Sequence, residues 1–160
     1  MIYLVRHAHA GDKQTWPGPD DRRPLSSPGR AEAHGLLTRL ATARVATIVS
    51  SPALRCRQTV AALAAQRGVP VGLDPRLGVQ ADLAATMALL FTADPDLDVV
   101  LCTHGEVIER LLGALRAGGA PVNRDATWPK GSTWVLRTDG ATITAADYLP
   151  PLALAVEPAY

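Results

Sequence analysis

Short apolar runs alternate with amphipathic stretches along most of the chain. Ile2 to Val5 and Asp98 to Thr103 have the length and composition of buried strands, and Ala46 to Ser50 and Val69 to Leu73 predict two more. Strands that alternate with helices indicate βαβ units and a largely parallel sheet. The expected fold is therefore α/β: a three-layer sandwich with a mostly parallel central sheet and helices on both faces.

Four amphipathic stretches predict helices between these strands. A Ser-Pro pair, typical of a helix start, opens the first at Ser27 and the second at Ser51, and Gly68 suits the end of the second. The third is expected at Leu83 to Phe91, and the fourth follows Thr103. The inward-facing positions are Leu36, Leu37 and Leu40 in the first helix, Cys56, Val60, Leu63 and Ala64 in the second, and Val107, Ile108, Leu111, Leu112 and Leu115 in the fourth.

The remaining segments predict a hairpin and a long loop. Asp139-Gly140 separates two strand-like runs, Thr133 to Arg137 and Ala141 to Tyr148, which favours an antiparallel hairpin at the sheet edge. Gly11 to Pro28 is rich in Gly, Pro and Asp, and a loop of this length is usually functional. No repeat or charge block divides the chain, so residues 1–160 are expected to form a single domain.

Composition excludes some partners. The chain is 48% hydrophobic and 19% charged, as in ordinary globular proteins, and its net charge of +1 provides no basic surface for a nucleic-acid polymer or an anionic membrane. No 18-residue apolar run or leader pattern is seen, so a cytoplasmic protein without a membrane partner is expected. Cys56 and Cys102 are expected to be buried free thiols. The composition does not indicate an oligomeric state.

Three polar elements directly follow predicted strands: Arg6-His7, Ser50 to Arg55, and His104-Gly105. Ligands bind beyond the carboxyl ends of parallel strands, where these elements would meet. A neutral imidazole is a competent nucleophile towards phosphorus, and a guanidinium group matches phosphate oxygens. Arg55 lies in the first turn of a helix, where an anion would compensate its charge. Each element alone could be structural or solvated, but the coincidence of three indicates a phosphate site.

These elements resemble the motifs of the histidine phosphatase superfamily. Leu4 to Ala8 resembles its Arg-His-Gly motif, Ser50 to Thr59 its second motif, and Thr103 to Gly105 its third. The chain is most similar to SixA-type phosphohistidine phosphatases and, through Arg22 to Leu25 and Lys130 to Leu136, to the phosphatase domain appended to some MutT-type Nudix hydrolases. The resemblance implies a phosphoglycerate mutase-like fold and phosphatase activity.

The resemblance also implies a role for each catalytic residue. His7 would attack phosphorus and carry the phosphoryl group as a phosphohistidine. Arg6 and Arg55 would hold the nonbridging oxygens, and a protonated His104 would stabilise the same charge. Neither a metal ion nor a cofactor would be needed. The substrate would be a phosphorylated small molecule or a protein that carries phosphohistidine.

Two departures from the family pattern affect this expectation. Ala8 stands where the family usually has Gly, which is harmless only if the backbone needs no positive φ at this position. Many members have a Glu general acid on the loop before the third motif, whereas Leu77 to Thr86 contains only Asp82. Expelling an imidazole or a phosphate needs less proton donation than expelling an alkoxide. We therefore hypothesise phosphohistidine or another activated phosphate as substrate, rather than a sugar ester.

Two alternatives remain open: a nucleotide or other small-molecule phosphomonoesterase that uses the same site, and a non-catalytic phosphate-binding module. His9, Lys13, Asp82 and Lys130 are further candidates for binding the substrate, although each could simply be a solvated or structural residue. His7 and His9 could also mimic a metal-binding pair. The chain offers few further ligands, so no metal site is expected.

Overall fold

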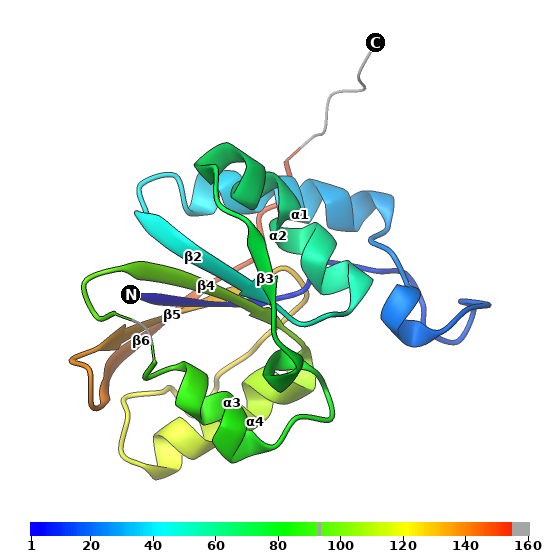
Figure 1. The fold of residues 1–160 in the computed structure, drawn as a ribbon. Coiled ribbons are helices and arrows are strands. Elements are labelled where there is room, and N and C mark those ends of the chain that lie inside the picture. The colour runs from blue at the N-terminus through cyan, green and yellow to red at the C-terminus, as the bar shows by residue number, and fades with distance from the viewer. Residues whose placement is uncertain (93, 155–160) are drawn as a thin grey trace.

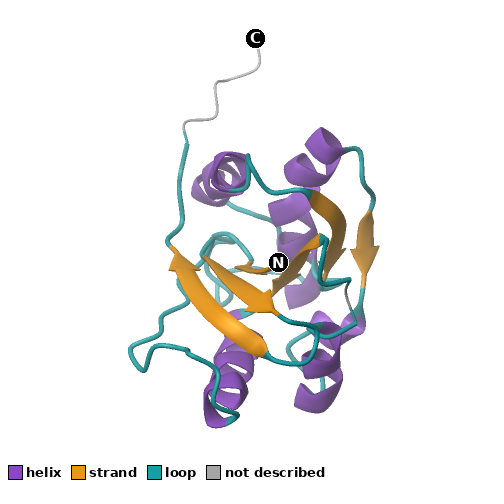
Figure 2. Cartoon of the chain, turned by 90° about the vertical axis from the view of Figure 1, so that its left-hand side faces the viewer, coloured by secondary structure: helices purple, strands orange, loops and turns teal. Residues whose placement is uncertain are grey.

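The chain folds into a six-stranded sheet with helices on both faces, which confirms the predicted α/β three-layer architecture (Figure 1). The computed structural model describes residues 1–92 and 94–154. Helices α1 and α2 cover one face, and α3 and α4 cover the other (Figures 1 and 2). The elements in chain order are β1 (Ile2–Arg6), the 3-10 turn η1 (Asp20–Arg22), α1 (Ser27–Arg39), β2 (Val45–Ser50), α2 (Leu54–Arg67), β3 (Val71–Leu73), the 3-10 turn η2 (Pro75–Leu77), α3 (Leu83–Leu89), β4 (Asp98–Thr103), α4 (Gly105–Ala117), β5 (Thr133–Thr138) and β6 (Ile143–Leu149).

The strand order places the predicted polar elements at one edge of the sheet. The order is β3-β2-β4-β1-β5-β6, in which the first four strands run parallel and β5 and β6 run antiparallel to their neighbours. Arg6 pairs with Thr103, and Ser50 pairs with Cys102, so β1, β2 and β4 end side by side. Because β5 is antiparallel, it begins at this same edge, where Thr133 pairs with Val5.

The apolar stripes of the helices bury against the two faces of the sheet. Buried side chains of α2 meet those of β2 and β4, and the predicted inner face of α4 packs on the other side against β1 and β4. The inward-facing residues predicted for α2 and α4 are all buried; in α1, Leu36 and Leu40 are buried and Leu37 is partly buried. Burial of this apolar surface is the main favourable contribution to folding. It also fixes the strand ends that carry the polar residues.

Helix starts are the places where the sequence prediction needed correction. The side chain of Ser26, not Ser27, caps α1 by accepting the N–H of Gly29. The prediction that Ser51 caps α2 is wrong, because α2 begins at Leu54 after Ala53, which makes no side-chain cap. Gly68 does end α2 in the left-handed conformation, with φ of 67°.

The terminal hairpin forms with a longer turn than Asp139-Gly140 alone would give. Thr138 pairs with Ile143, so four residues connect β5 to β6. The Asp139 carboxylate accepts the N–H groups of Ala141 and Thr142, which organises this turn.

Among the described residues, no helix is both long enough and apolar enough to cross a membrane.

Candidate active site

Main-chain hydrogen bonds extend the sheet past the strand ends and set the backbone of the site. The N–H of His7 donates to the carbonyl of Thr103 at 2.9 Å, and the N–H of Ser51 donates to that of Cys102 at 2.9 Å. On the β5 side, the N–H of Arg6 donates to the carbonyl of Ser132 at 3.0 Å. Three distant segments are thereby held together through backbone groups, which leaves their side chains available for chemistry.

His7 presents one ring nitrogen to the centre of the site and uses the other as an anchor. Nδ1 lies 2.9 Å from the carbonyl oxygen of Ala8, which can only accept, so Nδ1 carries the proton and Nε2 keeps its lone pair. Burial lowers the pKa of His7 to about 3; the bond to Ala8 acts in the opposite direction, and the charge of Arg55 lowers the pKa further. At neutral pH the ring is therefore uncharged.

Arg55 joins the two imidazoles. Its guanidinium group is buried, with Nε 3.3 Å from Nε2 of His7 and one terminal nitrogen 3.2 Å from Nδ1 of His104. The two rings meet edge to face with centroids 5.4 Å apart. Because α2 begins one residue earlier, Arg55 projects from the first turn of the helix, while its neighbour Arg57 is exposed and turned away.

His104 directly precedes α4 and is fixed on both ring nitrogens. Nε2 lies 2.9 Å from the hydroxyl of Ser51, and Nδ1 accepts a hydrogen bond from Arg55, since a guanidinium can only donate. Nδ1 is an acceptor in this arrangement, so it can donate to a phosphate only after Arg55 leaves it, and the protonated His104 that the resemblance implies stays an expectation. Ser51, assigned as a helix cap from the sequence, instead orients this ring.

Arg6 lies beside the first residue of α4. One terminal nitrogen donates to the carbonyl of Trp128 at 2.7 Å, whereas the buried Nε has no hydrogen-bond partner among the described residues. An unpaired buried donor is costly, and an anion would satisfy it. A Cβ atom at Gly105 would lie 2.9 Å from this Nε, so glycine is what allows the guanidinium to lie here. We call Arg6, His7, Arg55 and His104 the His–Arg cluster.

Ala8 is compatible with the site. No residue other than glycine has a positive φ in the described part of the chain, so Ala8 needs no glycine-like backbone. Its N–H donates to the hydroxyl of Thr59 at 2.9 Å, and the same hydroxyl donates to the carbonyl of Arg55 at 2.7 Å. Nearby, Gln58 accepts the N–H of Leu25 at 2.8 Å. The Gln-Thr pair of the second motif therefore ties Ala8 and the long loop that follows β1 to the start of α2.

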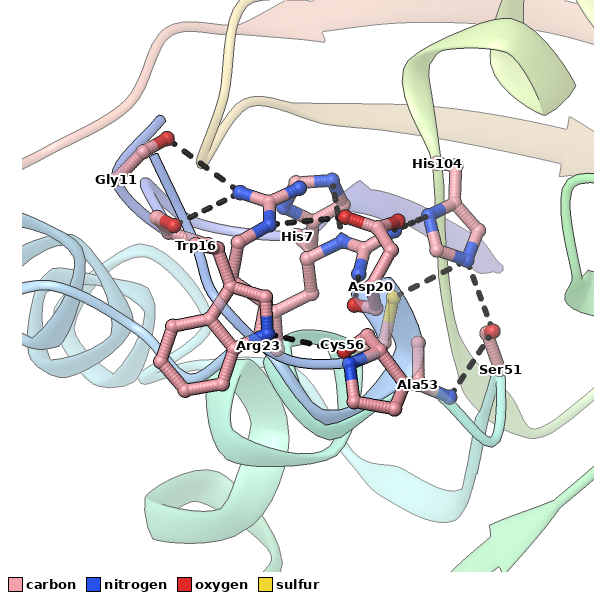
Figure 3. Close-up of polar contacts among 12 residues, drawn as sticks. His7, Gly11, Trp16, Asp20, Arg23, Ser51, Ala53, Cys56 and His104 are labelled. Carbon is pink, nitrogen blue, oxygen red and sulfur yellow. Dashed lines mark hydrogen bonds and ion pairs between the residues drawn. The ribbon is translucent and has the colours of Figure 1, made fainter. Parts of the chain in front are cut away.

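Asp20, on the long loop between β1 and α1, contacts the His–Arg cluster directly. Oδ2 lies 3.1 Å from a terminal nitrogen of Arg55, and the main-chain carbonyl of Asp20 accepts from the other at 2.6 Å. Oδ1 accepts from Nε of Arg23, which is itself buried and donates to the carbonyl of Ala10. Figure 3 shows the Asp20 carboxylate with a dashed line to Arg23, in the same view as the rings of His7 and His104. The sequence analysis placed Asp20 only within the long loop from Gly11 to Pro28; the Asp-x-x-Arg spacing across a tight turn was the available signal.

The other candidates divide between two cavities. A cavity of about 530 Å³ is lined by His9, Lys13, Lys130 and Arg23, together with Gly11 and Asp12. Asp82 lines a different cavity, of about 580 Å³, which also contains Asp20, Arg55 and His104 and has a mainly apolar wall. Three of the four further candidates for binding the substrate, His9, Lys13 and Lys130, thus lie together, and Asp82 lies apart from them.

Asp82 already has a structural task. Its Oδ2 accepts the N–H of Ala85 at 3.1 Å and so caps the start of α3, with the side chain exposed.

His9 and the two cysteines make structural contacts or are buried. His9 is half-buried, with Nδ1 2.6 Å from the hydroxyl of Ser26. Within residues 1–92 and 94–154, no group of three or more His, Cys, Asp or Glu side chains is arranged to hold a metal ion. Cys56 and Cys102 are free and buried, as predicted.

Comparisons with known proteins agree with this geometry. The family model of the histidine phosphatase superfamily (branch 1) matches residues 2–78. An 8-oxo-(d)GTP phosphatase of Mycolicibacterium smegmatis is 34% identical over 155 residues, which are 94% of this chain and 48% of that protein. The chain therefore spans about half the length of this curated relative.

Solved structures of two SixA proteins share the fold along almost the whole chain. The SixA protein of Agrobacterium tumefaciens is 28% identical with a TM-score of 0.75, over 94% of this chain and 97% of the other. The SixA protein of Nakamurella multipartitia is 25% identical with a TM-score of 0.70, over 95% of this chain and 96% of the other. With its two motif histidines and two motif arginines gathered at one sheet edge, the chain belongs to the histidine phosphatase superfamily, and its fold is similar to that of the SixA proteins.

Proposed function

We propose that the chain hydrolyses a phosphorylated substrate without a metal ion, through a phosphohistidine formed on Nε2 of His7. One observation carries the proposal: the unprotonated Nε2 of a neutral imidazole accepts a hydrogen bond of 3.3 Å from a buried guanidinium that also contacts a second imidazole. In the first step Nε2 attacks phosphorus and the bond to the leaving group breaks. Arg6, Arg55 and His104 stabilise the negative charge on the phosphoryl oxygens.

The experiment is mass spectrometry of enzyme quenched in base during turnover of 4-nitrophenyl phosphate in the presence of a chelator. We expect one acid-labile, base-stable phosphate on the peptide that contains His7. In His7→Ala we expect neither the label nor turnover. Full activity in His7→Ala would reject the mechanism, and loss of wild-type activity in chelator would point to a metal hydrolase. Phosphate binding without any turnover would indicate a binding module.

For the substrate, we propose phosphohistidine or another activated phosphate. The loop from Leu77 to Thr86 has no Glu, and the one carboxylate on it, Asp82, caps α3. Activated leaving groups need little proton donation, which suits such a site. The two SixA proteins that share the fold carry the name phosphohistidine phosphatase. Comparing kcat/KM for a phosphohistidine peptide, a nucleotide and a sugar monophosphate tests the choice, and a clear preference for the sugar ester would overturn it.

A nucleotide is the second candidate substrate, supported by the Mycolicibacterium relative that is an 8-oxo-(d)GTP phosphatase. The mainly apolar cavity of about 580 Å³ beside His104 has a size that suits a nucleoside. We propose that His9, Lys13 and Lys130, in the neighbouring cavity, bind further phosphate groups. In the same comparison of substrates, Lys130→Ala would then lower kcat/KM for a nucleoside diphosphate more than for a phosphohistidine peptide.

A further inference from the structure

Asp20 is hydrogen-bonded to Arg55 of the His–Arg cluster, and a phosphoryl group on His7 would weaken this contact. Oδ2 lies 3.1 Å from the terminal nitrogen of Arg55 that also contacts Nδ1 of His104. A phosphoryl group on His7 would compete for this nitrogen. Oδ1 would stay on Arg23, because that guanidinium is anchored at 2.7 Å to the carbonyl of Ala10. The carboxylate would therefore remain beside the phosphoryl group with one oxygen released.

The released oxygen would face the path of the incoming water. The side chain of Asp20 is 34% exposed, and it lines the cavity of about 580 Å³ that opens onto Arg55 and His104. Water must reach the phosphorus opposite to Nε2 of His7, on the open side of the cluster. Of the carboxylates in the described part of the chain, Asp20 is the one hydrogen-bonded to the His–Arg cluster.

The charge state of Asp20 suits proton acceptance. Burial raises the pKa of this carboxyl, but the hydrogen bond from Arg23 and the charge of Arg55 outweigh that effect and hold the pKa below its ordinary value. The carboxylate is therefore ionised at neutral pH.

We propose that Asp20 is a catalytic residue, the general base that activates the water which hydrolyses the phosphohistidine. This inference rests on the proposed function. The water oxygen forms a bond to phosphorus while the bond from phosphorus to Nε2 of His7 breaks, and that electron pair returns to Nε2. One water proton moves to Oδ2 of Asp20, and the product leaves as hydrogen phosphate. Asp20 then returns the proton to solvent.

The test separates the two steps with 4-nitrophenyl phosphate, whose leaving group needs no acid. In Asp20→Asn and Asp20→Ala we expect a full first-turnover burst of nitrophenol, followed by a steady state slower by roughly 100-fold or more, in the range of a lost general base. Phosphate on His7 should accumulate under mass spectrometry. The control is Asp96→Asn, which removes an exposed carboxylate that lines neither of the two cavities and should turn over like wild type.

The burst amplitude counts the folded, competent sites in each variant, so slow dephosphorylation behind a full burst cannot come from unfolding. The inference is overturned if both variants dephosphorylate as fast as wild type. It is also overturned if the burst is lost together with the steady state, because Asp20 would then serve binding or folding. If wild-type enzyme never carries phosphate on His7, the proposed function itself fails, and this outcome is distinct from the other two.

Discussion

At Gly105, the main chain of α4 runs so close to Arg6 that a Cβ atom would lie 2.8 Å from its Cζ atom. The obstacle is the end of a flexible side chain rather than backbone, so an added methyl group would push the guanidinium aside without unfolding the protein. Arg6 is also the member of the His–Arg cluster whose buried Nε has no partner in the described residues. Gly105 of the third motif thus affects the position of the Arg6 guanidinium more than the helix that it begins.

We expect Gly105→Ala to lower kcat/KM by about 100-fold, the order of loss when one donor to a developing oxyanion is removed. The unfolding midpoint in urea should change little. The matched control is Gly113→Ala in the same helix, where a Cβ atom meets nothing within 4 Å. It should leave activity unchanged and raise stability by up to about 1 kcal/mol, since Ala favours helix over Gly. Equal activity of Gly105→Ala and wild type would show that Arg6 is not held as described.

Sequence alone predicted that His7, Arg6, Arg55 and His104 lie at one sheet edge, where the structure has them, but not what surrounds them. These four follow buried strands or open helices, and such positions are visible as apolar runs that stop at a polar residue. Ser51 was misjudged because a serine before a helix looks the same whether its hydroxyl caps the helix or binds an imidazole 53 residues away. The contact of Asp20 with Arg55 spans 35 residues and depends on how the long loop folds back.

At the scale of elements, periodicity was most reliable where an element is buried on all sides. The predicted range Asp98 to Thr103 is also the observed extent of β4, which lies between β2 and β1. At the exposed edge, β3 is two residues shorter than predicted, starting at Val71 instead of Val69. The third helix also ends earlier, at Leu89 instead of Phe91. Edge elements bury less apolar surface, so their ends are set by local turns that an apolar pattern does not encode.

The docking of α1 onto the segment after β1 depends on one glycine. A Cβ atom at Gly29 would lie only 1.8 Å from the carbonyl oxygen of His9, and backbone cannot move aside as a side-chain end can. We expect Gly29→Ala to lower the free energy of unfolding by about 1–3 kcal/mol, as for other overpacked sites. Urea denaturation measures the change, with Gly113→Ala as the reference for a helical Gly→Ala exchange without a clash. A stability equal to that of the reference would contradict the close approach.

For the molecule as a whole, burial of His7 makes the free energy of unfolding depend on pH. The pKa of His7 is lowered mainly by burial to about 3, against an ordinary value of 6.5 for the unfolded chain. Below pH 6.5, His7 is therefore protonated in the unfolded chain, whereas in the folded chain it stays neutral down to about pH 3. The stability contributed by a neutral His7 is fully present above pH 6.5 and is lost as the pH falls through this window.

We expect wild type to lose stability relative to His7→Asn as the pH is lowered from 7 to 5, because asparagine does not titrate. The difference between the two should approach a slope of about 1.4 kcal/mol per pH unit well below pH 6.5, the value for one proton. Urea unfolding of both proteins at several pH values measures it, and the difference cancels the other histidines. Parallel curves would mean that the ring of His7 titrates normally in the folded chain.

Main-chain hydrogen bonds between neighbouring strand ends hold the His–Arg cluster in place. The two cavities described above are instead lined largely by connecting segments, residues 9–26 and 75–82. Connections tolerate insertion and replacement far better than paired strands do. Substrate selectivity therefore depends mainly on the connecting segments, whereas the chemistry depends on the strand ends that carry the His–Arg cluster. An engineer could exchange these connections to redirect the protein to a new phosphate donor while the reacting groups keep their places.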